Sequence, residues 1–193
     1  MKGNNESKLK FTQVREEIKT ALESVDEVLI GKLIDQIWTT ITNRKRIFLI
    51  GNGGSSATCD HFANDLTLLG IRNETIVDCR SLSSNNALLT CVANDYGYEH
   101  VFSKQLETIC QNGDLLICFS ASGNSKNLIN ACQVVKMKGA LVASVLGFDG
   151  GELKERSDIS IHFKTLLGNY GVAEDSHLIL CHYLSRKLQE MFN

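Results

Sequence analysis

Apolar residues recur every three or four positions in the first part of the chain, from Phe11 to Thr42. This spacing places them on one face of an amphipathic helix, so it predicts helical structure over 11–42. Gly31 lies in the middle of this stretch, and we expect it to separate two helices. The N-terminal segment, 1–45, is then a helical part that packs on the rest of the domain.

A different pattern begins after Arg46, where the unbroken apolar run IFLIG is followed by NGGSS. Such a run predicts a strand that is covered on both faces, and the small polar residues predict a turn and an N-capped helix. The same order returns at 114–138, where DLLICF precedes SASGNSKN. GALVASVLGFDGG predicts another buried strand, and TIVDC (75–79) and DISIHF (158–163) are further strand candidates.

Helical spacing also covers 84–93, 98–110 and 175–192. Buried strands that alternate with helices predict an α/β fold, a three-layer αβα sandwich with a mainly parallel sheet of the flavodoxin or Rossmann type. Ligands of such sheets bind at the carboxyl ends of the strands. The turns that follow the strands are therefore the first places to look for chemistry.

Composition narrows the class of protein. The 193 residues fit one domain, and the formal net charge of −2 offers no basic field for a nucleic acid. Seven cysteines without a CxxC pair favour reduced thiols in a cytoplasm over a disulfide framework. The N-terminus has no apolar leader, and no run of about 18 apolar residues is present. We expect a cytoplasmic protein of one domain, 1–193, without nucleic-acid or membrane partners.

Two turns have the composition of anion sites. Gly51-Asn52-Gly53-Gly54-Ser55 joins a strand to a helix, where small residues let backbone N–H groups approach a phosphate, although a tight connection that needs positive φ would look the same. It is neither a Walker A loop nor a GxGxxG fingerprint. The turn from Ser120 to Ser125 gathers three hydroxyls, more than an N-cap and a turn require. Together they indicate a phosphorylated small molecule, in particular a phosphorylated sugar.

Two groups of titratable residues are candidate metal ligands. Their spacing alone does not decide between metal binding and an ordinary structural role. His61 and Asp65 are four apart on one helix face, which suits either a metal or a surface hydrogen bond. A second group, Glu174, Asp175, His177 and His182, lies on the last helix and suits either a metal or a solvated face with a core histidine. The pair Asn94-Asp95 either binds sugar hydroxyls or caps a helix.

The order of these motifs resembles one family. GNGGS, His61, ANDYG, SASGNS, DGG and a closing E-x-x-H-x-x-x-x-H follow one another as in the sugar isomerase (SIS) domain, specifically the phosphoheptose isomerases. The resemblance implies a homotetramer with active sites at subunit interfaces, to which segment 1–45 contributes. It also implies conversion of sedoheptulose 7-phosphate to D-glycero-D-manno-heptose 7-phosphate through an enediolate, for lipopolysaccharide or capsule, with one Zn²⁺ per subunit.

The resemblance also implies roles for particular residues. The acid and base would be Asp65 and His182, and the zinc ligands would be His61, Asp65, Glu174 and His182. The substrate-binding residues would be Asn52, Gly53, Gly54, Ser55, Asp65, Asn94, Asp95, Ser120, Ala121, Ser122, Ser125 and Glu174.

Three of the candidate site positions depart from the family pattern, as do the segments 68–70 and 171–173. Asp65 replaces a glutamate, Glu174 replaces a glutamine, and Ala121 replaces a threonine. The shorter Asp65 side chain shifts a carboxylate by about an ångström, enough to change a rate by on the order of 10²-fold. Two alternatives therefore stay open: an isomerase of another phosphosugar, and a non-catalytic SIS protein like the DnaA initiator-associating factor.

Overall fold

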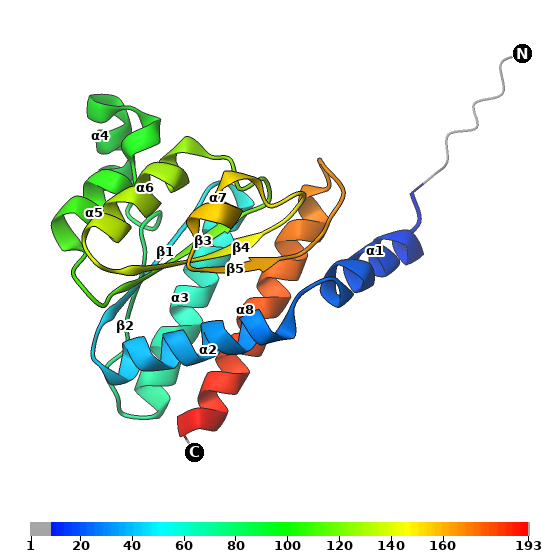
Figure 1. The fold of residues 1–193 in the computed structure, drawn as a ribbon, viewed down its shortest axis with the longest axis horizontal. Helices are drawn as coiled ribbons and strands as arrows, with labels where there is room; N and C mark the ends of the chain where they lie inside the picture. The colour runs from blue at the N-terminus through cyan, green and yellow to red at the C-terminus, as the bar shows by residue number, and fades with distance from the viewer. Residues whose placement is uncertain (1–8, 193) are drawn as a thin grey trace, which may run out of the picture.

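One parallel sheet organises the chain, whose computed structural model describes residues 9–192. Its strands lie in the order β2-β1-β3-β4-β5 (Figure 1). They are β1 (Arg46–Gly51), β2 (Asp78–Ser81), β3 (Leu115–Ser120), β4 (Leu141–Leu146) and β5 (Ile159–His162). All four neighbouring pairs are parallel. This order reverses between β1 and β3, the place where doubly wound sheets bind their ligands.

Helices cover both faces of the sheet, which confirms the three-layer αβα sandwich. The chain forms α1 (Phe11–Glu23), α2 (Glu27–Thr42), α3 (Gly54–Arg72), α4 (Asn86–Tyr96), η1 (Tyr98–His100), α5 (Ser103–Ile109), α6 (Lys126–Met137), α7 (Gly151–Arg156) and α8 (Tyr170–Phe192). α2, α3 and α8 pack on one face, and α5, α6 and α7 on the other. α1 projects from this body (Figure 1). No helix within 9–192 is long and apolar enough to cross a bilayer.

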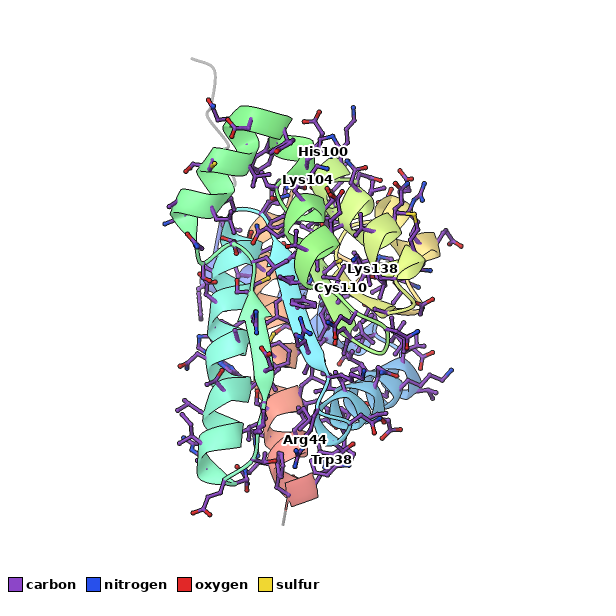
Figure 2. The ribbon with its side chains drawn as sticks, turned by 90° about the vertical axis from the view of Figure 1, so that its left-hand side faces the viewer. Trp38, Arg44, His100, Lys104, Cys110 and Lys138 are labelled. Atoms are coloured by element: carbon purple, nitrogen blue, oxygen red, sulfur yellow. The ribbon has the colours of Figure 1, made fainter. Side chains whose placement is uncertain are left out.

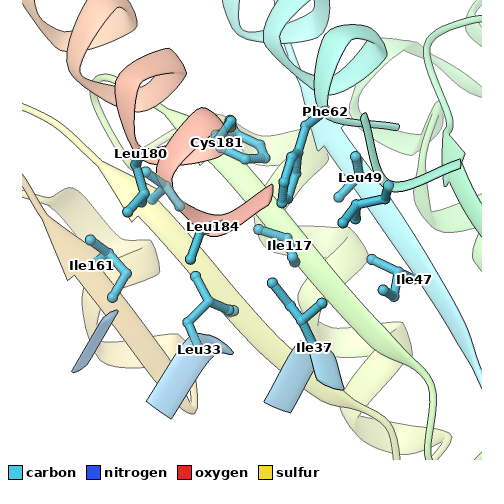
Figure 3. Close-up of a cluster of buried hydrophobic side chains, with 14 of the residues drawn as sticks. Leu33, Ile37, Ile47, Leu49, Phe62, Ile117, Ile161, Leu180, Cys181 and Leu184 are labelled. Carbon is cyan, nitrogen blue, oxygen red and sulfur yellow. The ribbon is translucent and has the colours of Figure 1, made fainter. Parts of the chain in front are cut away.

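The alternation of side chains along each strand divides the core into two large clusters. Ile117 of β3 faces Leu33 and Ile37 of α2 and the neighbouring helices (Figure 3). Its neighbours Leu116 and Cys118 belong to the cluster on the opposite face. Because both faces of β3 are buried, the apolar run predicted this strand without any polar alternation.

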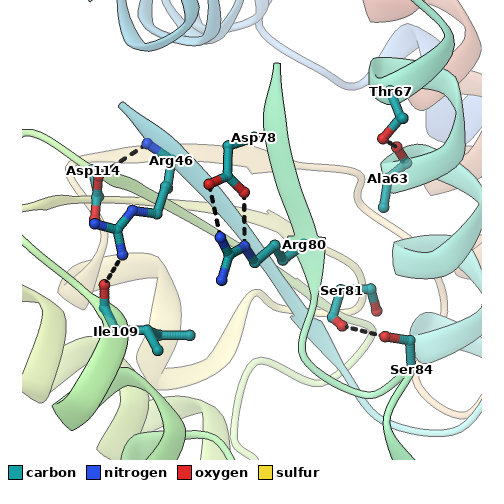
Figure 4. A network of polar contacts seen from close by, with 9 residues as sticks. All are labelled: Arg46, Ala63, Thr67, Asp78, Arg80, Ser81, Ser84, Ile109 and Asp114. Atoms are coloured by element: carbon teal, nitrogen blue, oxygen red, sulfur yellow. Dashed lines mark hydrogen bonds and ion pairs between the residues drawn. The ribbon is translucent and has the colours of Figure 1, made fainter. Parts of the chain in front are cut away.

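A buried carboxylate aligns the amino ends of β1 and β3. Asp114, 1% exposed, accepts the N–H of Arg46 at 2.9 Å (Figure 4). It also accepts the N–H of Gln111 at 2.8 Å. Figure 2 views the molecule from the β2 side, with Arg44 near this end of the sheet and His100 near the other. The polar anchor therefore lies at the end of the sheet opposite the strand-end turns.

Several element boundaries differ from the sequence prediction. Gly31 lies inside α2, and the break falls earlier, where Asp26 caps the helix by accepting the N–H of Val28 at 2.9 Å. β2 begins at Asp78 because Thr75 closes the end of α3 by donating its N–H to Gly70 at 2.9 Å. The cap and the closing bond outweigh the apolar pattern at these places.

The helices after β2 also differ. Asn94 and Asp95 form the last turn of α4 and do not lie in a loop, since the helix ends only at Gly97, whose φ is 91°. The segment predicted as one helix over 98–110 is divided into η1 and α5, and α8 begins five residues before the predicted 175. α7 was not predicted.

His177 lies in the core beneath the strand ends. Its ring is 0% exposed and packs 6.2 Å from Phe119 and 5.9 Å from Phe163, measured between ring centroids. Neither ring nitrogen has a hydrogen-bond partner among the described residues. Burial lowers the pKa of His177 from 6.5 to about 4, because the charged ring would lose its hydration.

This burial predicts a pH dependence of stability. Between pH 6.5 and pH 4, His177 binds a proton in the unfolded chain but stays neutral in the folded chain. The free energy of unfolding therefore falls as the pH falls through this window. We expect a loss of about 3 kcal/mol for the wild type and a smaller slope for His177→Leu. Urea denaturation of the metal-free protein at several pH values measures both, and equal slopes would contradict the prediction.

Two helical glycines make a matched pair for stability. A Cβ at Gly31 would meet nothing within 4 Å, whereas a Cβ at Gly70 would lie 2.9 Å from the Thr75 carbonyl oxygen. We expect Gly31→Ala to raise the free energy of unfolding by about 0.5–1 kcal/mol through helix propensity. Gly70→Ala should lower it, since the backbone of Thr75 must move. Chemical denaturation of both variants tests the pair, and changes of the same sign would refute it.

Candidate functional site

The two predicted turns lie beside each other at the carboxyl ends of β1 and β3. Gly51, the last residue of β1, pairs with Phe119 of β3, so the residues that follow leave the sheet at the same level. The chain then continues into α3 on one face and into α6 on the other. The place where such helices start, on opposite faces of the sheet, is where a doubly wound sheet takes its ligand.

The first turn exposes backbone at the start of α3. Gly53 has φ 55° and ψ −126°, a conformation that side-chain-bearing residues rarely adopt. Ser55 is 5% exposed and donates its N–H to the Asn52 carbonyl at 3.0 Å. Gly53 and Gly54 are exposed, so this helix start is accessible from solvent.

Side chains from three segments meet at Asn52. Asn52 and Asn127 exchange two amide hydrogen bonds, Nδ2 of Asn52 to Oδ1 of Asn127 at 3.0 Å and Nδ2 of Asn127 to Oδ1 of Asn52 at 2.8 Å. The Tyr98 hydroxyl also donates to Oδ1 of Asn52, at 2.8 Å. The first turn is thereby tied to α6 and to η1.

In the second turn the serine oxygens accept hydrogen bonds from the backbone. Oγ of Ser120 accepts the N–H of Gly123 at 3.0 Å, and Oγ of Ser122 accepts the N–H of Asn124 at 3.3 Å. The hydroxyl hydrogens therefore stay available for an anion. Ser125 occupies the N-cap position of α6, where the N–H groups of the first turn lack partners in the helix.

Close packing against the β4–α7 turn shapes the second turn. Gly123 has φ 65°, and a Cβ there would overlap the carbonyl of Gly150. Asn124 accepts the N–H of Glu152 at 2.9 Å. Ala121 is 6% exposed, so it contributes backbone more than side chain to this surface.

A histidine and carboxylate cluster lies between α3 and α8. Nε2 of His61 is 2.9 Å from Nε2 of His182 and 3.6 Å from Oδ2 of Asp65. One ligand atom from each of the three residues lies within 4.8 Å of the others. The structure thus brings together residues 121 positions apart that spacing alone could not join.

The donor set fits a divalent transition-metal ion. Bonds of about 2.0–2.1 Å in a tetrahedral site place ligand atoms about 3.3 Å apart, close to the separations around His61. The His61 side chain is 45% exposed and that of Asp65 is 20% exposed, so an ion can enter. Three protein ligands also leave a fourth position open, as in catalytic sites.

Glu174 lies apart from this cluster. Its carboxylate packs against Gly54 at the start of α3, where a Cβ would overlap it. It precedes His182 by eight residues on α8, about 12 Å along the helix axis. A carboxylate at a helix N-terminus is electrostatically favourable. Its neighbour Asp175 is exposed, and His177 belongs to the core.

Asn94 and Asp95 lie on the exposed surface of α4. Nδ2 of Asn94 donates to Asp95 at 2.9 Å, and Sγ of Cys91 lies 3.6 Å from the same carboxylate. Within 9–192, no side-chain hydrogen bond of either residue reaches the two turns.

Sequence reasoning missed Tyr98 and Asn127. Asn127 is 2% exposed and lies next to Leu128 on the core side of α6. A polar residue at a buried helix position must find a hydrogen-bond partner, so this position could have been recognised from the sequence. No sequence pattern marked Tyr98, because the residue that it contacts, Asn52, is 46 positions away in the chain.

Comparisons with known proteins agree with this geometry. The SIS domain family model matches residues 10–147. The phosphoheptose isomerase of Helicobacter pylori (strain P12) is 34% identical over 182 residues, covering 94% of this chain and 93% of that protein. The phosphoheptose isomerase of Glaesserella parasuis is 43% identical over 140 residues, covering 69% and 72%.

Solved structures share the fold. Phosphoheptose isomerase GmhA from Neisseria gonorrhoeae superposes with a TM-score of 0.83 at 26% identity, covering 93% of this chain and 95% of that one. A phosphoheptose isomerase from Francisella tularensis gives 0.78 at 22% identity, covering 93% and 92%, which bears on the fold alone. The chain therefore belongs to the SIS domain family and, within it, to the phosphoheptose isomerases.

Proposed function

We propose that this protein converts sedoheptulose 7-phosphate to D-glycero-D-manno-heptose 7-phosphate. The observation that carries the proposal is the His61, Asp65 and His182 cluster on α3 and α8, in a chain that also has two strand-end turns that suit a phosphosugar. The same cluster argues against a non-catalytic SIS protein, because such a protein has no need of three converging ligands. Family membership supplies the reaction.

The phosphate is assigned to the second turn. The hydroxyls of Ser120, Ser122 and Ser125, with the backbone of Ala121, would surround it at the start of α6. Hydrogen bonds to a charged phosphate contribute more than those between neutral groups. The sugar is assigned to the first turn, where Asn52, Gly53, Gly54 and Ser55 lie, and Asn94 and Asp95 of α4 are assigned to it by family membership.

His61, Asp65 and His182 would hold one zinc ion per subunit. When bound, zinc polarises the sugar oxygens and stabilises negative charge on them. One carboxylate and two neutral imidazoles leave a net charge of +1, because Glu174 lies outside the cluster. The site then keeps more Lewis acidity than four ligands with two carboxylates would give.

Asp65 and His182 are assigned as the acid and base. Exchange of ketose and aldose requires removal of a proton beside a carbonyl and return of a proton to the neighbouring carbon, through an enediolate. Imidazole suits this near neutral pH. A residue that also holds the metal acts on the proton only through an atom that the metal leaves free, which both side chains have.

The setting of the reaction is part of the proposal. A homotetramer with interfacial active sites is supported by α1, which projects from the body of the domain. Phe11 on this helix is 84% exposed, and Leu9, just before it, is 73% exposed. A cytoplasmic location is supported by seven free thiols. The product would feed heptose-containing lipopolysaccharide or capsule.

An isomerase assay tests the reaction. Metal-depleted protein should be inactive on sedoheptulose 7-phosphate, and one equivalent of zinc per subunit should restore turnover. His182→Ala should lose about 10²-fold or more, because it removes both a ligand and a proton carrier. Product formation and zinc content are measured on the same samples.

Other results would redirect the proposal. Stoichiometric zinc without turnover would move it to another phosphosugar, which a substrate panel would identify. Absence of zinc binding would favour the non-catalytic SIS protein.

The phosphate assignment has its own test. Ser120→Ala removes a hydroxyl that the phosphate would accept from, so we expect KM to rise about tenfold with kcat little changed. Ser144→Ala is the matched control, since Ser144 is also buried on a strand but bonds Ser160 at 3.3 Å. An unchanged KM in Ser120→Ala would refute the assignment.

A further inference from the structure

The hydrogen-bonding capacity of Asn52 is almost completely used within the protein. Its Oδ1 accepts from Tyr98 at 2.8 Å and from Asn127 at 2.8 Å, which occupies both lone pairs. Its Nδ2 donates one hydrogen to Asn127 at 3.0 Å. Of the Asn52 side chain, only one N–H of Nδ2 is therefore left to bond a ligand.

The two partners differ in burial, which separates their structural and functional contributions. Asn127 is 2% exposed, so its amide would be costly to leave unpaired. Tyr98 is 52% exposed, and its hydroxyl has water as an alternative partner. Tyr98 bonds Asn52 all the same, and loss of that hydroxyl should cost the fold little. Asn127 follows Ser125 by two residues, so the pair also links the two turns.

We propose that Tyr98 and Asn127 are positioning residues that orient the Asn52 amide so that its remaining N–H donates to an oxygen of the sugar. The inference rests on the proposed function for the identity of that sugar. With Oδ1 saturated, Asn52 cannot accept a hydrogen bond from a hydroxyl. It recognises a carbonyl oxygen, or an oxygen on which negative charge develops.

Removal of the Tyr98 hydroxyl tests the orientation. We expect Tyr98→Phe to lower kcat/KM for sedoheptulose 7-phosphate about tenfold. Zinc content, thermal stability and inhibition by inorganic phosphate should not change, since the metal cluster and the second turn are intact. Tyr96→Phe is the matched control, because Tyr96 is 57% exposed on α4 and should keep full activity. Equal activity of both variants and the wild type would overturn the proposal.

Asn52→Asp tests the direction of the hydrogen bond. The carboxylate still accepts from Tyr98 and from Asn127, but it has no hydrogen to give, so the bond from Nδ2 of Asn52 to Oδ1 of Asn127 is lost together with the donor to the ligand. We expect a loss of about 10²-fold, the size seen when one donor to a developing oxyanion is removed. Retained activity in this variant would therefore overturn the proposal.

A substrate-free measurement keeps this inference separate from the proposed function. In the NMR spectrum of the ligand-free protein, the two Asn52 side-chain amide hydrogens should exchange with water at different rates, and Tyr98→Phe should shift both signals. Equal rates and unmoved signals would overturn the positioning roles whatever the substrate. Unequal rates with shifted signals, in a protein that does not turn over sedoheptulose 7-phosphate, would support the orientation and refute only the proposed reaction.

Discussion

The parallel pairing of β1 with β3 is the contact on which the site depends. Six-residue strands in register bring Gly51 and Phe119 to the same level, so the turns that follow them start side by side. The strand order reverses at this pair, which sends α3 and α6 to opposite faces and leaves their first turns unobstructed. Asp114 fixes the other end of the same pair. A shift of one residue in this register would turn the buried side chains of β3 to the wrong faces and would separate the turns.

Packing of α3 against α8 has a comparable effect on the histidine and carboxylate cluster. Phe62 and Leu66 of α3 lie in one core cluster with Cys181 and Leu184 of α8. Their neighbours in sequence, His61, Asp65 and His182, are thereby held at the rim of the same helix contact, where they meet each other and remain partly exposed. The apolar stripe that stabilises the two helices therefore also sets the spacing of these three side chains. No further structural element is needed to position these side chains.

Much of this arrangement was predictable from the sequence because it follows from local patterns. Apolar runs predicted the strands, and the Gly-rich and Ser-rich turns predicted their ends. The pair of His61 and Asp65 was visible from its spacing, but its third member was not, since only the α3–α8 contact brings His182 to it. Helix limits at Gly31 and Asn94 were wrong where a cap or a positive φ outweighed periodicity. Tyr98 acts through a contact between distant segments, and no local pattern encodes that.

The position of Glu174 makes the two turns electrostatically different. Its carboxylate lies on Gly54 at the start of α3, whereas among residues 9–192 no carboxylate is hydrogen-bonded to the serine turn at the start of α6. Negative charge at the first turn repels a phosphate and attracts hydroxyl donors, whereas the open helix start at the second turn attracts the phosphate. Under the proposed function, a phosphosugar at these turns would be oriented with its phosphate beside β3 and its hydroxyls beside β1. In this orientation the Asn52 N–H meets the sugar end of the molecule, which is the end that the isomerisation changes.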